Sequence, residues 1–241
     1  VYMLQTMVKI AELLGKEEDK KYFLENAEKA KIGYRKLVEC SNFSLDTDRQ
    51  AKLVRPLFMG LLDENQKEFA QKRLIDALNN YNWRLGTGFL STPFILYVLE
   101  DINVEYAYKL LENEEMPGWL FMSKMNANTI WESWEGIEAQ GGIASLDHYS
   151  KGAVLEVVSE MCGIKVAGEN QFIISPKVGG KFTFAKCEYQ SIYGKISCAW
   201  EKETNKVKFK IDIPANTNAK FILPNGEKDL STGKYEFSLK I

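Results

Sequence analysis

The hydrophobic pattern of the chain changes its period once, near Gly168, and this change limits the folds that the chain can adopt. Before that point apolar residues recur every three to four positions, which is typical of amphipathic helices, whereas the residues after it alternate or form short β-rich runs. A length of 241 residues suits one domain and a smaller module. We therefore predict an α+β protein of two domains, with residues 1–167 helical and residues 168–241 built of strands.

The helical part is predicted to consist of paired helices. One apolar stripe runs from Val1 to Leu14 and a second from Tyr22 to Leu37, with Gly15 between them as a helix end. Short turns separate further helical windows, which cover Arg49 to Leu61, Glu64 to Asn80, Pro93 to Leu99, Val104 to Glu112 and Ala144 to Met161. This pattern predicts helical hairpins.

The last third of the chain is predicted to form a small antiparallel β-sandwich. Between Lys206 and Ile213 apolar and charged residues alternate, so that one face of the strand is buried and the other is wet. Turn residues separate the expected strands, which are Phe172 to Ile174, Lys181 to Ala185, Ile192 to Trp200, Lys206 to Ile213, Ala219 to Leu223 and Tyr235 to Ile241.

Composition excludes several classes of function. With one histidine, His148, a site of several imidazoles is impossible, and a net charge of −2 offers no basic field for nucleic acid. The sequence contains no dinucleotide fingerprint, nucleophile elbow or metal-ligand spacing, so we predict no metal ion and no cofactor. Four unpaired-looking cysteines, no apolar run near 18 residues and no signal-peptide cleavage region predict a cytoplasmic protein with no membrane partner.

The segment Thr129–Gly136 is the strongest candidate for chemistry, because Trp131 and Trp134 bracket Glu132. A carboxylate beside indoles is partly desolvated, which suits it to proton transfer, and aromatic faces pack against sugar rings. The alternative is that Trp131 and Trp134 are core residues on one helical turn and that Glu132 is a solvated or capping acid.

Other segments could contribute to the same site. His148 follows a Gly-Gly turn and could return to the cavity of Glu132 to donate to a substrate hydroxyl, with Asp147 orienting its ring; a structural role is the alternative. Trp119 belongs to an aromatic, thioether-rich stretch that follows Pro117. The glycine-rich run Gly86–Pro93 lacks the Lys-Ser/Thr of a phosphate loop and is interpreted as a helix-entry loop.

Taken in order, these segments resemble the C-terminal half of the bacterial α-L-rhamnosidases, an inverting glycoside hydrolase family. The likeness covers nearly the whole chain, and its specificity lies in the combination of motifs. The chain has Ser133 and Asp147 where the family usually has Arg and Asn. The matching stretches include Asp48-Arg49-Gln50-Ala51, Gly86 to Pro93, Met116-Pro117-Gly118-Trp119, Thr129-Ile130-Trp131-Glu132-Ser133-Trp134, Asp147-His148-Tyr149, Ile174-Ser175-Pro176 and Ile213-Pro214-Ala215-Asn216-Thr217.

The resemblance implies an (α/α)6 barrel, here only in part, followed by a β-sandwich. It implies that Glu132 is the general base, that His148 binds rhamnose, and that Trp131, Trp134 and Trp119 line the pocket. The family's general acid lies in earlier barrel helices, which would precede Val1. We therefore expect a C-terminal part of a rhamnosidase that lacks its acid, with a rhamnose-containing glycoside or polysaccharide and the missing N-terminal part as partners. Another glycosidase or lyase on the same barrel, or a non-catalytic carbohydrate-binding or structural module, are the alternatives.

Overall fold

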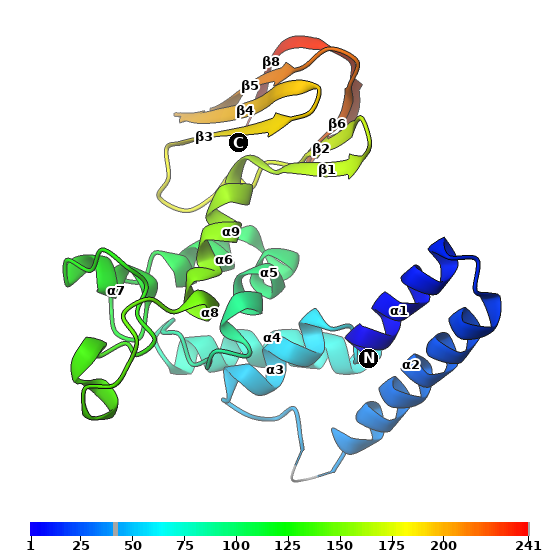
Figure 1. Ribbon diagram of the computed structural model, residues 1–241. Helices are drawn as coiled ribbons and strands as arrows, with labels where there is room; N and C mark the ends of the chain where they lie inside the picture. Colours follow the sequence, from blue (N-terminus) through cyan, green and yellow to red (C-terminus); the bar gives the residue numbers. More distant parts are fainter. Residues whose placement is uncertain (41–42, 241) are drawn as a thin grey trace. The chain divides into compact units, whose positions relative to one another are not determined.

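The computed structural model describes residues 1–40 and 43–240, and its elements divide into two compact units (Figure 1). The first unit comprises Val1–Ile102 and Asn113–Lys151 and is helical; the second comprises Asn103–Glu112 and Gly152–Ile241 and holds the strands. The predicted order of helical hairpins followed by a β-domain is confirmed. The boundary expected after residue 167 stays a prediction.

The first unit opens with a helical hairpin. Helices α1 (Tyr2–Leu13) and α2 (Glu17–Leu37) lie antiparallel (Figure 1), with Gly15 at a positive φ of 63° in the turn between them. Acidic residues fill the first turn of α2 and basic residues its last turn, which complements the helix dipole. Both helices match the predicted apolar stripes.

Three further helices form the core of this unit: α3 (Gln50–Phe58), α4 (Glu64–Asn80) and α5 (Thr92–Ile102), with α3 packed on both α4 and α5. Helix α4 starts where the sequence predicts, because Asp63 and Gln66 form a reciprocal capping box at its N-terminus. One stripe of each helix is buried, and the buried residues of the three helices include Leu53, Val54, Ala70, Leu74, Leu78, Ile95 and Leu99.

A buried amide joins α3 to the glycine-rich run. The Gln50 side chain donates to the Arg84 carbonyl (2.9 Å) and accepts from the Gly86 N–H (2.8 Å), and only 1% of Gln50 is exposed. A Cβ atom at Gly86 would lie 2.9 Å from the Gln50 amide carbon, so a side chain at position 86 would displace it. The loop that precedes α5 is thus fixed at its first residue.

The predicted helix Ala144 to Met161 is wrong as a single element. Residues 144–148 are irregular, and the remainder forms two short helices, α8 (Tyr149–Gly152) and α9 (Val154–Ser159), and a 3-10 turn, η2 (Glu160–Cys162). Helix α7 (Trp119–Lys124) and the 3-10 helix η1 (Gly136–Gly141) were not predicted. Short helices lack enough residues to show a period, and residues 145–148 instead bond to another segment, as described below.

The strands of the second unit form two four-stranded sheets. One has the order β1 (Ile164–Gly168), β2 (Gln171–Ile174), β6 (Asn218–Leu223), β7 (Gly226–Leu230); the other has the order β3 (Phe184–Ser191), β4 (Gly194–Glu203), β5 (Lys206–Ile213), β8 (Gly233–Lys240). All pairs are antiparallel except β2 with β6. Ile241, the last residue of an expected strand, lies outside the described residues.

Helix α6 (Val104–Leu111) belongs to this second unit. Its Tyr108 packs against the ring of Phe182, at 5.7 Å between centroids, and against Gly179 and Gly180. A Cβ at Gly179 would lie 2.5 Å from the Tyr108 ring, so glycine permits this approach. The hydroxyl of Tyr108 also donates to the Lys177 carbonyl. The helix is therefore anchored to the segment that leads into β3.

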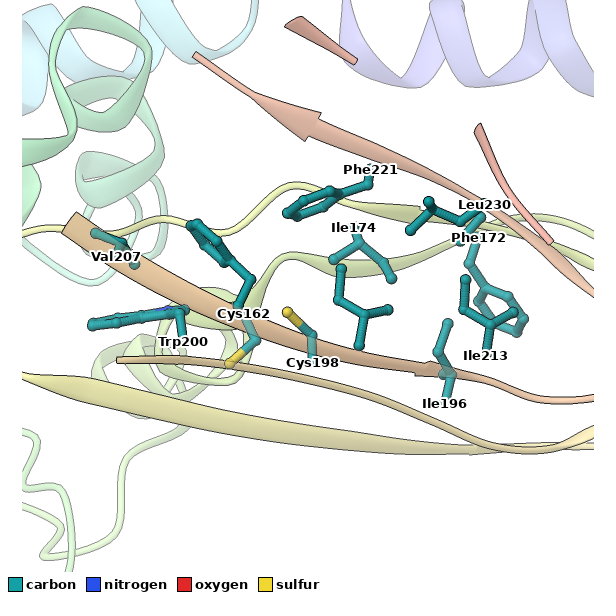
Figure 2. Packing of buried hydrophobic residues seen from close by; sticks show 13 residues of the cluster. Cys162, Phe172, Ile174, Ile196, Cys198, Trp200, Val207, Ile213, Phe221 and Leu230 are labelled. Carbon is teal, nitrogen blue, oxygen red and sulfur yellow. The ribbon is translucent and has the colours of Figure 1, made fainter. Parts of the chain in front are cut away.

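Alternating residues of the two sheets meet in one apolar core (Figure 2). On β5 the predicted period of two is confirmed, since its four inward apolar residues are at most 2% exposed. The indole of Trp200 donates to the Met161 carbonyl (3.0 Å), which satisfies its polar atom inside the core. The buried residues of this core are Cys162, Phe172, Ile174, Ile196, Cys198, Trp200, Val207, Phe209, Ile211, Ile213, Ala219, Phe221 and Leu230.

Three cysteine thiols meet in this core. Cys162 and Cys198 are fully buried (Figure 2), and Cys187 lies directly opposite Cys198 in the β3–β4 register. The hydrogen bond with Cys187 favours the Cys162 thiolate, but Cys198 and burial oppose it, and the pKa of Cys162 is raised to about 12. The hydrogen bond with Cys162, together with burial, raises the pKa of Cys187.

Thiol reactivity provides a test of this arrangement. In the native protein we expect Cys40, which is exposed, to react with an aromatic disulfide reagent at least about 100-fold faster than Cys162, Cys187 and Cys198, because thiolate is the reactive form. In denaturant all four should react alike. A Cys40→Ser variant should lose the fast phase, and a fast phase that persists in that variant would contradict the buried cluster.

Among the described residues, no helix combines the length and the apolar character that a membrane crossing needs.

Candidate active site

The segments that the sequence singled out come together in the first unit, although they are far apart along the chain. The Leu85 N–H donates to the Pro117 carbonyl (2.9 Å), which joins the loop before α5 to the residues that precede α7. The Ser150 hydroxyl donates to the Phe89 carbonyl, which joins the same loop to α8. One region of the unit thus holds the glycine-rich run, the Trp119 segment and the His148 segment.

Main-chain hydrogen bonds place the Glu132 segment beside the His148 segment. The Glu132 N–H donates to the Ser145 carbonyl (2.8 Å), and the His148 N–H donates to the Ile130 carbonyl (2.8 Å). The Ser145 N–H in turn donates to Oε2 of Glu132 (2.8 Å). The predicted return of His148 across the glycine turn is therefore observed in the backbone, and Glu132 is half-buried at this junction.

The tryptophans are not arranged as one face of a helix. Residues 129–135 are irregular, so the alternative in which Trp131 and Trp134 share a helical turn is wrong. Trp131 packs over Gly136, where a Cβ would lie 3.2 Å from the ring, whereas Trp134 meets Trp119 edge-on at 6.4 Å between centroids. The indoles of Trp131 and Trp134, which flank Glu132 in the sequence, are half-buried, and Trp119 is 5% exposed.

Lys151 is a buried cation in the same region, and sequence reasoning missed it. Its ammonium group donates to the main-chain carbonyl of Glu132 and lies 3.8 Å above the centroid of the Trp134 ring. Its own carbonyl accepts from the Trp119 indole (3.0 Å). Burial lowers the pKa of Lys151 to about 8, against the opposing effect of Glu135 and Glu132. In the sequence Lys151 is one lysine of many, and only its position three residues after His148 hints at the site.

A second carboxylate acts electrostatically on this cation. The side chain of Glu135 accepts from the Ser133 hydroxyl (2.9 Å), and its own backbone N–H and that hydroxyl lower the pKa of Glu135. Ser133, at the position between the two indoles, is thereby directed to Glu135. Glu135 is exposed, whereas Glu132 is half-buried, so the two acids have different surroundings.

His148 lies between two aromatic side chains. Its ring stacks on Tyr149 at 5.2 Å between centroids and meets Phe89 edge-on at 6.5 Å. Its Nδ1 is buried and has no hydrogen-bond partner within residues 1–40 and 43–240. The orienting bond suggested for Asp147 is therefore not formed at Nδ1, and Asp147 itself is exposed. A buried, unpaired nitrogen is costly, which marks this ring as a candidate for a polar ligand or a water.

The chemistry available here is that of a carboxylate. Glu132 can accept a proton, indoles can pack against an apolar face of a ligand, and His148 can form hydrogen bonds. In the part of the chain that the structure describes, no group of three or more His, Cys, Asp and Glu side chains is placed to hold a metal ion.

A half-buried carboxylate among tryptophans, in a helical-hairpin domain that a β-sandwich follows, is an arrangement typical of carbohydrate-active protein families. Comparison with known families identifies which one. The chain belongs to the bacterial α-L-rhamnosidases: residues 1–161 match the bacterial alpha-L-rhamnosidase 6 hairpin glycosidase domain, and residues 165–238 match the bacterial alpha-L-rhamnosidase C-terminal domain.

Individual relatives agree with this assignment. An alpha-L-rhamnosidase of Streptomyces avermitilis is 32% identical over 191 residues, which are 76% of this chain and 18% of that protein. An α-L-rhamnosidase structure from Dictyoglumus thermophilum has a TM-score of 0.89 at 26% identity and covers 99% of this chain and 31% of its own. A Streptomyces avermitilis structure complexed with L-rhamnose has a TM-score of 0.86 at 26% identity, over 98% and 26% of the two chains. This chain thus spans less than a third of the length of these relatives.

The buried ammonium of Lys151 predicts an unusual dependence of stability on pH. Its folded-state pKa of about 8 lies below the ordinary value of 10.5, so between these values the unfolded chain binds more protons and stability rises with pH. We expect the free energy of unfolding of the wild type, relative to Lys151→Met, to increase by about 2–3 kcal/mol from pH 7.5 to pH ~10.5. Urea unfolding at several pH values measures this difference.

Lys124→Met is the matched control, because Lys124 is exposed. The free energy of unfolding of the wild type relative to Lys124→Met should not change over this pH range. If the difference between the wild type and Lys151→Met is also independent of pH, the Lys151 ammonium group is not buried as described.

Proposed function

We propose that this chain is the C-terminal part of an enzyme that hydrolyses terminal, non-reducing α-L-rhamnose from glycosides or polysaccharides with inversion. The observation that carries the proposal is Glu132, a half-buried carboxylate held by the Ser145 N–H beside Trp131 and Trp134, in a chain of the α-L-rhamnosidase family. The relative with L-rhamnose bound supports rhamnose as the sugar.

In this mechanism Glu132 is the general base. Inversion requires one displacement, in which water attacks the anomeric carbon while a carboxylate takes its proton and an acid protonates the leaving oxygen. The Ser145 N–H bonds Oε2 of Glu132, which fixes the carboxylate and leaves Oε1 to accept the proton.

The sugar is bound by the aromatic residues and the histidine. Trp131 and Trp134 are half-buried, so each has a face available to the apolar side of the rhamnose ring. Trp119, which is nearly inaccessible, contributes to the pocket through its edge-on contact with Trp134. His148 donates to or accepts from a sugar hydroxyl, and its aromatic neighbours Phe89 and Tyr149 fix the plane of its ring.

One experiment separates catalysis from binding. In the longest natural polypeptide that contains this chain, Glu132→Gln should lower kcat for an aryl α-L-rhamnoside by about 10²- to 10⁴-fold and leave rhamnose affinity nearly unchanged, because the amide keeps the shape but not the basicity. His148→Ala should show the converse, with rhamnose affinity reduced about tenfold. Steady-state kinetics and titration calorimetry measure the two effects.

Glu138→Gln provides the control, since Glu138 is an exposed residue of η1. It should leave both quantities unchanged. Unchanged turnover in Glu132→Gln would remove Glu132 from the mechanism. Hydrolysis of a different glycoside with none of rhamnosides would favour another glycosidase or lyase, and binding without turnover by any substrate would favour a carbohydrate-binding module.

The general acid is proposed to lie in a part of the barrel that is not contained in these 241 residues. Residues 1–241 alone should then bind rhamnose weakly and turn over rhamnosides at least about 10²-fold more slowly than the longer polypeptide, because leaving-group protonation is lost. Activity assays of both polypeptides on the same substrate check this. Equal rates would show that the acid is within this chain.

A further inference from the structure

Lys151 is a buried charge that the mechanism above does not use. Only 5% of the residue is exposed, and taking an ammonium group out of water costs free energy unless its hydrogen bonds and charge are compensated. An apolar side chain of similar length would fill the same space without this cost. Packing alone therefore does not account for a lysine at this position.

The contacts of Lys151 converge on the Glu132 segment. Its ammonium group donates to the Glu132 carbonyl, while Ser145 accepts the Glu132 N–H and donates to its side chain. The N–H, the carbonyl and one carboxylate oxygen of Glu132 are thus all bonded. The carboxylates that act electrostatically on Lys151 are those of Glu132 and Glu135.

The same cation also fixes an indole. The Lys151 ammonium lies 3.8 Å from the centroid of the Trp134 ring, within the range of a cation–π contact. Trp134 meets Trp119 edge-on, and the Trp119 indole donates to the Lys151 carbonyl (3.0 Å). These three residues close a ring of contacts. Replacement of Lys151 would remove the donor to the Glu132 carbonyl, whereas the Trp134 ring would keep its edge-on contact with Trp119.

We propose that Lys151 is a positioning residue for the reaction: its ammonium group fixes the Glu132 main chain and the Trp134 ring, and so holds the carboxylate where it meets the attacking water. The proposal rests on the proposed role of Glu132 as the base. In this role Lys151 acts on the position of Glu132 and Trp134, and not by contact with the water or the sugar. Its effect comes through geometry, to which proton transfer is sensitive on the scale of an ångström.

The test compares Lys151→Met, Lys151→Arg and Lys124→Met in the longest natural polypeptide that contains this chain. Lys151→Met should lower kcat by about 10- to 100-fold with KM and rhamnose affinity changed less than about threefold, because the base is displaced while the sugar contacts remain. Lys151→Arg should recover most of kcat, since a guanidinium can donate to a carbonyl and stack on an indole. Lys124→Met should match the wild type.

A double-mutant comparison distinguishes positioning of the base from a general loss of structure. In a Glu132→Gln background, Lys151→Met should lower the residual rate less than about twofold, because there is no base left to position. A general structural role would lower the rate by the same factor in both backgrounds. If Lys151→Met does not fold, as judged by circular dichroism, Lys151→Gln is measured in its place, and the same pattern is expected.

Two results would overturn the inference. These are an unchanged kcat in the Lys151 variant, or equal losses with and without the Glu132 carboxylate. The proposed function fails on a different measurement, namely full turnover by Glu132→Gln alone, in which case Lys151 has no base to position. The two failures are therefore separate.

Discussion

The pairing of residues 130–132 with residues 145–148 is the constraint on which the candidate site depends. Neither segment is helix or strand, so no ladder of regular hydrogen bonds positions them. Three bonds do so: the N–H of Glu132 to Ser145, the N–H of His148 to Ile130, and the N–H of Ser145 to the Glu132 carboxylate. Further hydrogen bonds hold each segment to other parts of the unit. Next to the second segment, the Ser150 hydroxyl donates to the loop before α5, and within the first segment the Trp131 N–H donates to the sulfur of Met122 (3.4 Å).

Much of the fold could be predicted from periodicity. Helix α4 was predicted with its observed bounds from the helical spacing of its apolar residues, and β5 because its apolar and charged residues alternate without exception. Strand β7 was missed since four of its five residues are exposed, which leaves no alternation to detect. The stretch from Ala144 to Met161 was predicted as one helix because its spacing is helical; its first residues pair with a distant segment instead.

The candidate site was only partly predictable, because features that depend on neighbouring residues can be deduced from the sequence, whereas contacts between distant segments cannot. The sequence indicated Glu132, His148 and the three tryptophans from their chemistry and local order, and the backbone of Glu132 does lie beside that of the His148 segment. What could not be deduced is that a lysine is buried among them, because its partners are a main-chain carbonyl and an indole from other segments. Local order also suggested that Asp147 orients the His148 ring. In the structure Asp147 is exposed and forms no hydrogen bond to Nδ1 of His148.

The loop that carries η1 connects the two paired segments, residues 130–132 and residues 145–148. Because its two ends are joined at Glu132 and Ser145, the path of the backbone between them is not needed to hold the carboxylate. Loops anchored in this way tolerate insertions at small entropic cost. Residues 137–142 are thus a place where the chain can accept changes of length and composition without loss of the bonds that hold Glu132.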